Sequence, residues 1–242
     1  MALNIRRTSE ISKHHLTMAV YGHAGAGKTR MCATFEPERT LIISAESGLL
    51  SIRDKDLAFF QVKEISDMIE ITEALASDSE EVKGFDMICI DSLTEVAEAV
   101  LSYEKEQTNH GMKAYGALAE RMIKLIKAYR DMPRHVLFTM KMNRIEDRDS
   151  GRATYGPDLP GGKLKQAIPY YLDQVGYVEM TENEQGEKES LITFEKFRGH
   201  PDVKDRSGVF KEGWFPADLT RIAKMIAMDT RAHQKAHKEA KG

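Results

Sequence analysis

The segment from Gly22 to Thr29 reads Gly-His-Ala-Gly-Ala-Gly-Lys-Thr and matches the pattern G-x-x-x-x-G-K-S/T at every fixed position. Glycines let consecutive backbone N–H groups turn toward a phosphate without obstruction by Cβ, and a following helix adds its dipole. In this pattern the Lys28 amine reaches the β- and γ-phosphates and the Thr29 hydroxyl binds Mg²⁺. We therefore expect ATP and Mg²⁺ to bind here, with the nucleotide contacting Gly22, His23, Ala24, Gly25, Ala26, Gly27, Lys28, Thr29 and Arg30.

A second segment brings a carboxylate to the same place. Residues 86–91 read Asp-Met-Ile-Cys-Ile-Asp, an apolar strand that ends in an acid and follows the phosphate loop by about sixty residues. This is a Walker B pattern, in which Asp91 lies beside the Mg²⁺ that Thr29 binds. Asp91 and Ser92 are thus expected to supply the charge and polar contacts around the metal.

Hydrolysis also needs a group that orients or deprotonates the attacking water. Two carboxylates are candidates: Glu46 follows the apolar run 41–44, and Glu95 lies one helical turn after Asp91. Ligands of open α/β sheets bind beyond the carboxyl ends of the strands, which favours Glu46. A helix cap or a loop contact remains the structural alternative for this residue.

The elements that must position these groups alternate along the chain. Short apolar runs at 16–21, 40–44, 57–62, 86–91 and 135–140 are separated by helical patterns at 30–35, 65–76, 93–107 and 114–131. This alternation predicts an α/β fold with a mostly parallel central sheet flanked by helices. An antiparallel strand pair is expected at 174–181 and 190–197, and a last helix after Pro216. We divide the chain into a polar arm (1–15), one ATPase core (16–228) and a charged tail (229–242).

Residues 143–165 are rich in glycine, proline and charges and predict a long loop, a kind of segment that is usually functional or disordered. Five basic residues and four acids give it a net charge of only +1. Basic side chains that meet phosphates and an aromatic ring that stacks on bases are typical of single-stranded DNA binding. The candidates are Arg144, Arg148, Arg152, Tyr155, Lys163 and Lys165; an ordinary solvated loop is the alternative.

Composition and charge argue against some classes of protein, such as secreted and membrane-spanning proteins. The 242 residues carry a net charge of −3, so no overall basic field indicates nucleic acid, although residues 64–106 are strongly acidic and residues 221–242 are basic. Two cysteines in apolar contexts are expected to be core residues in a reducing compartment. The first residues lack the apolar stretch of a secretory signal, and no window has the apolar length of a membrane span. These features predict a cytoplasmic protein with no membrane partner.

Two stretches resemble those of RecA-like proteins. A glutamate just past the second strand, with Asp91-Ser92 closing the Walker B strand, looks like the RecA pattern, in which that glutamate is the catalytic base. Lys204-Asp205-Arg206-Ser207-Gly208 is similar to the Lys-x-Arg-x-Gly stretch of RecA-like hexameric helicases. The resemblance implies that Lys204 and Arg206 join Lys28 and Glu46 in catalysis by reaching the γ-phosphate of a neighbouring subunit. A solvated basic turn is the alternative.

One position departs from RecA. RecA has a glutamine that senses the γ-phosphate at the end of the strand corresponding to 135–140, where this chain reads Thr139-Met140-Lys141-Met142-Asn143. Lys141 could serve as a charged sensor in its place and would then contact the nucleotide.

Taken together, residues 16–220 resemble the Sak-type single-strand annealing proteins of phages, which have a RecA-like core. The resemblance rests on Gly22–Thr29, Asp86–Ser92, Tyr155–Lys163, Asp173 and Lys204–Gly208. It implies an ATPase, with DNA-stimulated hydrolysis, that binds single-stranded DNA and anneals strands as an oligomer, a ring or a filament, in the host cytoplasm and with a single-strand binding protein as a partner. A helicase-loader-like replication or packaging accessory is the alternative. A small-molecule kinase is disfavoured, because no arginine-rich lid is present.

Overall fold

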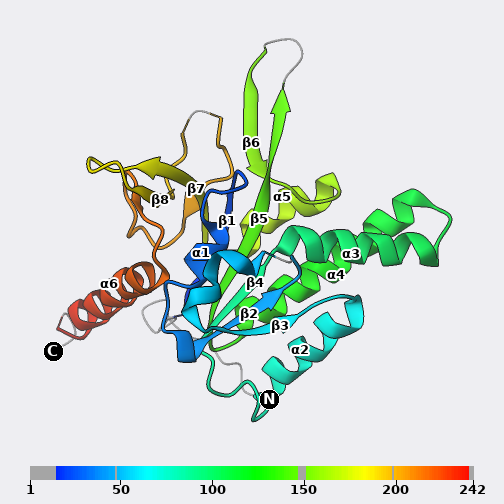
Figure 1. Ribbon diagram of the computed structural model, residues 1–242, viewed down its shortest axis with the longest axis horizontal. Coiled ribbons are helices and arrows are strands. Elements are labelled where there is room, and N and C mark those ends of the chain that lie inside the picture. Colours follow the sequence, from blue (N-terminus) through cyan, green and yellow to red (C-terminus); the bar gives the residue numbers. More distant parts are fainter. Residues whose placement is uncertain (1–14, 47, 147–150, 198, 240–242) are drawn as a thin grey trace.

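The computed structural model describes residues 15–46, 48–146, 151–197 and 199–239. Within them, ten strands form one sheet in the order β10-β8-β7-β1-β5-β4-β2-β3, with β6 paired to β5 and β9 paired to β7 (Figure 1). The strands are β1 Thr17–Gly22, β2 Thr40–Ser44, β3 Ala58–Gln61, β4 Met87–Asp91, β5 His135–Glu146, β6 Ala153–Pro157, β7 Gln174–Glu182, β8 Lys188–Thr193, β9 Lys204–Asp205 and β10 Phe215–Pro216. The helices are α1 Lys28–Cys32, α2 Ile65–Ser77, α3 Leu93–Gln107, α4 Gly111–Asp131, α5 Gly162–Tyr171 and α6 Leu219–Glu239, with short 3₁₀ helices η2 Pro37–Arg39 and η3 Leu49–Lys55.

The central strands are parallel, as the sequence predicted, and their register aligns the residues of interest. Ser44 of β2 pairs with Asp91 of β4, and Gly22 of β1 pairs with Lys141 of β5. Parallel strands that stand in register end at one edge of the sheet. The fold therefore gathers the phosphate loop, the Walker B aspartate and the candidate sensor at that edge.

Helices cover both faces of the sheet (Figure 1). Alternate residues of β1 point to opposite faces, as the pleat of a strand requires: Ala19 and Tyr21 pack into the core under α2–α5, whereas Met18 and Val20 pack into the core under α1 and α6. Both cysteines are fully buried in the second core, as expected. The predicted α/β fold of a P-loop NTPase, with an antiparallel pair formed by β7 and β8, is confirmed.

The predicted loop at 143–165 is wrong as an assignment of local structure. Strand β5 continues to Glu146 and pairs antiparallel with β6, with Arg144 opposite Tyr155, and α5 begins at Gly162. This β5–β6 hairpin projects from the body of the molecule (Figure 1). Much of it is exposed to solvent, including 54% of Ile145, so its strands lack the alternation of apolar and polar residues that identifies a half-buried strand.

The final helix is longer than predicted. Its buried residues Leu219, Ile222 and Ile226 lie at helical spacing, and the helix continues through the expected charged tail to Glu239. A charged sequence with good helix formers can extend a helix whose first turns are anchored by packing. Among the described residues, no helix combines the length and the apolar composition needed to cross a membrane.

Candidate nucleotide-binding site

The phosphate loop joins β1 to α1 and is packed tightly against the β7–β8 pair. Gly25 and Gly27 have positive φ angles of 78° and 94°, which glycine adopts without strain. A Cβ atom at Gly27 would lie 1.9 Å from the hydroxyl of Ser190, and that hydroxyl donates a 2.9 Å hydrogen bond to the carbonyl of Ala26. Gly27 thus serves the packing of the loop as well as phosphate access, and no sequence pattern predicted the contact with Ser190.

The amine of Lys28 lies inside this loop. Its Nζ donates hydrogen bonds of 2.9 Å to the carbonyl of Gly22 and 2.8 Å to the carbonyl of His23. Burial lowers the pKa of the Lys28 amine, and the nearby carboxylates of Glu46 and Asp91 act against that shift. A desolvated cation held at the base of a glycine loop fits the phosphates of a nucleoside triphosphate.

Asp91 is bound by two hydroxyls. It is only 2% exposed; Thr29 donates to one carboxylate oxygen over 2.8 Å, and Thr139 donates a short hydrogen bond to the other. Burial raises the pKa of Asp91, and the two hydroxyl donors oppose that rise. The Thr29 hydroxyl and the Asp91 carboxylate form an oxygen ligand pair that fits Mg²⁺, which takes its remaining ligands from phosphates and water.

Both candidates for the base lie next to Asp91. The Ser92 hydroxyl donates to Glu46 over 2.8 Å and accepts a 3.4 Å hydrogen bond from the backbone N–H of Glu95. The amine of Lys141 lies 3.6 Å from Glu46 and forms a closer ion pair with Glu95. Residues predicted separately, from three strand ends and one helix, thus meet at a single point beside the phosphate loop.

Lys204 and Arg206 lie elsewhere. Lys204 of β9 pairs with Val175, near the beginning of β7, and Arg206 bonds to Asp173 (3.2 Å) and to the carbonyl of Tyr170 (3.1 Å). The Asp173 N–H in turn donates to the carbonyl of Thr17, which is the first residue of β1. The phosphate loop follows the last residue of the same strand. Strand β1 separates the two positions by about 17 Å, at 3.3 Å per residue. Arg206 therefore cannot act on the phosphates of its own subunit.

The predicted DNA-binding residues divide between two elements. Arg144 and Tyr155 face each other on the hairpin, and Arg144 also forms a 2.8 Å ion pair with Glu146. Lys163 and Lys165 belong to helix α5. Arg152 begins the return toward β6, and Arg148 lies outside the described residues. One face of the Tyr155 ring is stacked on His200, so only part of this ring can meet a base.

A family model described as an AAA domain matches residues 14–207, which is most of the chain. The chain belongs to this family. A search of curated proteins found no match. Membership agrees with the geometry of the site, because AAA domains are P-loop ATPases, and it identifies the chain as a nucleotide-binding ATPase of the P-loop class.

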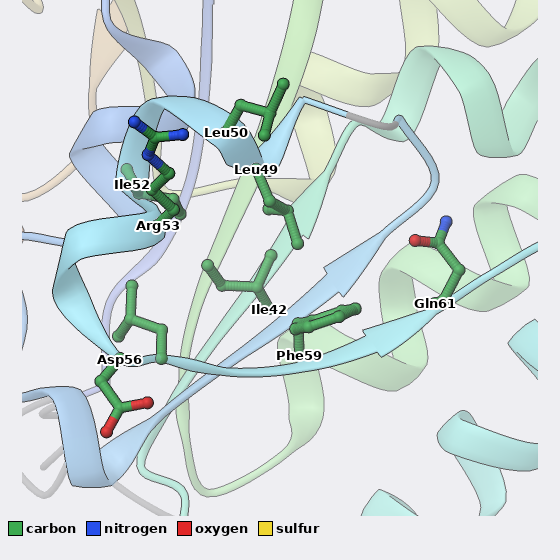
Figure 2. Close-up of a pocket in the computed structure, with 9 residues that line it drawn as sticks. Ile42, Leu49, Leu50, Ile52, Arg53, Asp56, Phe59 and Gln61 are labelled. Carbon is green, nitrogen blue, oxygen red and sulfur yellow. The ribbon is translucent and has the colours of Figure 1, made fainter.

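An apolar hollow of about 480 Å³ in this AAA domain is lined by residues of β2, β3 and η3. Ile42, Leu49 and Phe59 face one another between β2, β3 and η3, with Arg53 and Asp56 at its rim (Figure 2). No residue of the phosphate loop lines it.

Replacing Lys28 with Ala is expected to weaken ATP binding about 10- to 100-fold, because hydrogen bonds to charged groups contribute about 1.5–3 kcal/mol. Isothermal titration with ATP and Mg²⁺ measures the change. The matched control is Lys113→Ala, which removes an exposed lysine of α4. Wild-type affinity in the Lys28 variant would contradict the assignment of the phosphate loop.

Thr94 is a site residue that sequence reasoning missed. Its side chain is 3% exposed, accepts a 3.0 Å hydrogen bond from the N–H of Lys141 and donates a 2.8 Å bond to the carbonyl of Asp158. The Asp158 N–H closes the connection by donating to the carbonyl of Lys141. Thr94 thus fastens the start of α3 to both strands at the foot of the hairpin. No local motif marks it, because its partners lie 47 and 64 residues away.

Replacing Thr94 with Val keeps the shape but removes both hydrogen bonds of a side chain that is 3% exposed, which costs about 1–3 kcal/mol. We expect the Tm to fall by about 2–4 °C for each kcal/mol in a chain of this size. Thermal denaturation followed by circular dichroism measures this. Thr154→Val, the same change at an exposed position of β6, should stay within about 0.5 kcal/mol. Equal shifts in the two variants would contradict the role of Thr94.

Proposed function

We propose that this AAA-family protein hydrolyses ATP, binds single-stranded DNA and promotes the annealing of complementary strands as an oligomer. One observation carries the proposal. Strand β5 is continuous from the core, through Lys141 beside the phosphate loop, into the projecting β5–β6 hairpin (Figure 1). The nucleotide site and the element with the predicted DNA-binding residues are therefore parts of one strand.

The site residues divide the chemistry of hydrolysis among them. Lys28 and the N–H groups of the loop bind the phosphates. Mg²⁺, held by Thr29 and Asp91, would neutralise charge on the phosphate oxygens. Glu46 orients a water and takes its proton, while the Ser92 hydroxyl fixes the carboxylate over 2.8 Å.

Lys141 connects nucleotide binding to the hairpin. Its amine pairs with Glu95 and Glu46, and a γ-phosphate would compete with these carboxylates for the same cation. Any shift of Lys141 passes directly along β5 and, through Thr94 and Asp158, to the end of β6. This supports ATP-dependent DNA binding with a lysine in place of the RecA glutamine.

The remote position of Arg206 supports assembly. Since Arg206 cannot reach the phosphates of its own subunit, a catalytic role requires a neighbouring subunit, as the Lys-x-Arg-x-Gly resemblance implies. We therefore include Lys204 and Arg206 in the proposed oligomeric site. The cytoplasm as the location and a single-strand binding protein as a partner belong to the same proposal.

The experiment is a binding assay with a labelled single-stranded oligonucleotide, carried out with no nucleotide, with ADP and with a non-hydrolysable ATP analogue. We expect binding to be tightest with the analogue, and Lys141→Ala to bind DNA without this dependence. The affinity should fall with salt, because phosphate contacts release counterions. Hydrolysis without DNA binding in any nucleotide state would refute the DNA function and favour the accessory ATPase. An annealing assay with complementary oligonucleotides then tests the final step.

A further inference from the structure

Six aromatic side chains from distant parts of the chain form one cluster around His200. The His200 ring stacks on Phe197 (centroids 4.2 Å apart, 14° between planes) and on Tyr155 (5.1 Å, 16°). Tyr177 and Trp214 extend the cluster: Trp214 lies 5.9 Å from both Tyr177 and Phe197. The cluster consists of Tyr21, Tyr155, Tyr177, Phe197, His200 and Trp214.

The cluster has a rigid base and an exposed edge. Tyr21, Tyr177 and His200 are 0%, 6% and 6% exposed, and the Tyr21 hydroxyl is 3.0 Å from Nδ1 of His200. Phe197 and Trp214, by contrast, are 38% and 43% exposed. Phe197 and Trp214 therefore lie at the exposed edge of the cluster.

Its location joins the nucleotide site to the hairpin. Tyr21 immediately precedes Gly22 of the phosphate loop, and Tyr155 belongs to β6. The N–H of Tyr155 donates a 2.6 Å hydrogen bond to the carbonyl of Gly199, so the segment between β8 and β10 binds the foot of the hairpin. Gly199 has a φ of +84°, and a Cβ there would lie 3.2 Å from the Tyr155 ring.

Basic side chains flank the cluster. Lys165 of α5 and Lys196 lie within electrostatic reach of Asp202, and Lys196, Arg206 and Asp173 lie within reach of Lys204. Beside Trp214, the carboxylate of Glu195 accepts a 3.2 Å hydrogen bond from the N–H of Gly213. Burial raises the pKa of Asp202, and the charges of Lys165 and Lys196 oppose that rise. Exposed aromatic rings with lysine side chains nearby are features that sequence-tolerant single-strand binding uses.

We propose that Phe197 and Trp214 form a stacking platform for the bases of single-stranded DNA, with the neighbouring lysines contacting its backbone. This inference rests on the proposed function and names the place where the DNA passes the foot of the hairpin. The basic flank and the continuity with the hairpin favour a nucleic acid over a second copy of the chain. The platform assigns a binding role to Phe197 and Trp214, which the sequence patterns left without one.

Trp214 is the single tryptophan of the chain, so its fluorescence reports on this surface alone. We expect an unlabelled oligo(dT), with the ATP analogue present, to quench it in a saturable way. The midpoint should match that from anisotropy of a labelled oligo(dT). Trp214→Ala and Phe197→Ala should each weaken binding about 5- to 150-fold. Trp214→Phe should restore most of the affinity while abolishing the signal.

The matched control is Phe59→Ala, which removes a 57% exposed phenylalanine from β3, beyond β1, β5, β4 and β2 in the sheet. It should bind oligo(dT) like the wild type. Circular dichroism melts identify any variant that fails to fold. In that case the quenching of Trp214 in the wild-type protein decides whether the platform binds DNA. If anisotropy shows binding but Trp214 fluorescence does not change, the platform is refuted and the proposed function stands. Without binding in either assay, the DNA function fails as well. Protein-concentration-dependent quenching without DNA would assign the surface to a second copy.

Discussion

Replacing Glu46 with Gln is expected to leave ATP binding unchanged and to lower hydrolysis about 10²- to 10⁴-fold, the usual contribution of a positioned general base. The amide keeps the size of the side chain and can still accept the 2.8 Å hydrogen bond from Ser92. It cannot take a proton from water. Equilibrium titration with ATP and steady-state release of phosphate measure the two effects separately.

Glu95→Gln is the matched control, because it removes one negative charge from the same ion-paired group around Lys141. Glu95 is held by Lys141, whereas Glu46 follows the strand that pairs with the Asp91 strand. We therefore expect Glu95→Gln to retain most of the hydrolysis. The reverse result, with Glu95→Gln inactive and Glu46→Gln active, would assign the base to Glu95.

Replacing Arg206 with Ala is expected to preserve ATP binding and to lower hydrolysis about 10³- to 10⁵-fold, the effect of an arginine supplied in trans in GTPases. The guanidinium would stabilise charge that develops on the transferred phosphoryl group of a neighbouring subunit. In the single subunit it bonds to Asp173 and to the Tyr170 carbonyl, so assembly would have to redirect it. Asp173→Asn separates the two roles, since it weakens this ion pair but keeps the guanidinium.

Mixing the Arg206→Ala and Glu46→Gln proteins tests the trans arrangement directly. Some interfaces then combine an intact Glu46 with an intact Arg206, so activity should exceed the sum of the two separate variants. A turn with a structural role only would give a lower Tm, similar losses in Arg206→Ala and Asp173→Asn, and no gain on mixing. Wild-type turnover per subunit should also rise with protein concentration, because association completes the site.

The sequence predicted the part of the site that local patterns encode. The glycine loop, Asp91 and Glu46 each follow or end an apolar strand, and the ends of parallel strands meet at one edge of a sheet. For that reason it could be inferred that these residues lie close together, although no sequence pattern identified which residue each of them contacts. Lys141 belongs to this group as well, since it lies opposite Gly22 in the register.

The rest depends on contacts between distant segments. The hairpin resembles a loop in sequence because exposed strands carry no apolar period. The aromatic cluster brings together residues 21, 155, 177, 197, 200 and 214, whose spacing matches neither a helix nor a strand. The place of Arg206 relative to the phosphate loop follows from the pairing of β9 with β7, a two-residue strand that propensity does not identify.

Strand β5 extends beyond the part of it that is paired with β1 and β4. Strand β5 is paired with β1 through Lys141 and with β4 through Phe138, whereas Met142 to Glu146 are paired only with β6. Lys141 lies where the segment paired with β1 meets the segment paired with β6, and the strand from Lys141 to Glu146 is about 17 Å long. Each degree of tilt of this segment at Lys141 therefore moves Glu146 by about 0.3 Å. A small tilt of β5 at Lys141 would therefore move Glu146 farther than it moves the residues of the core.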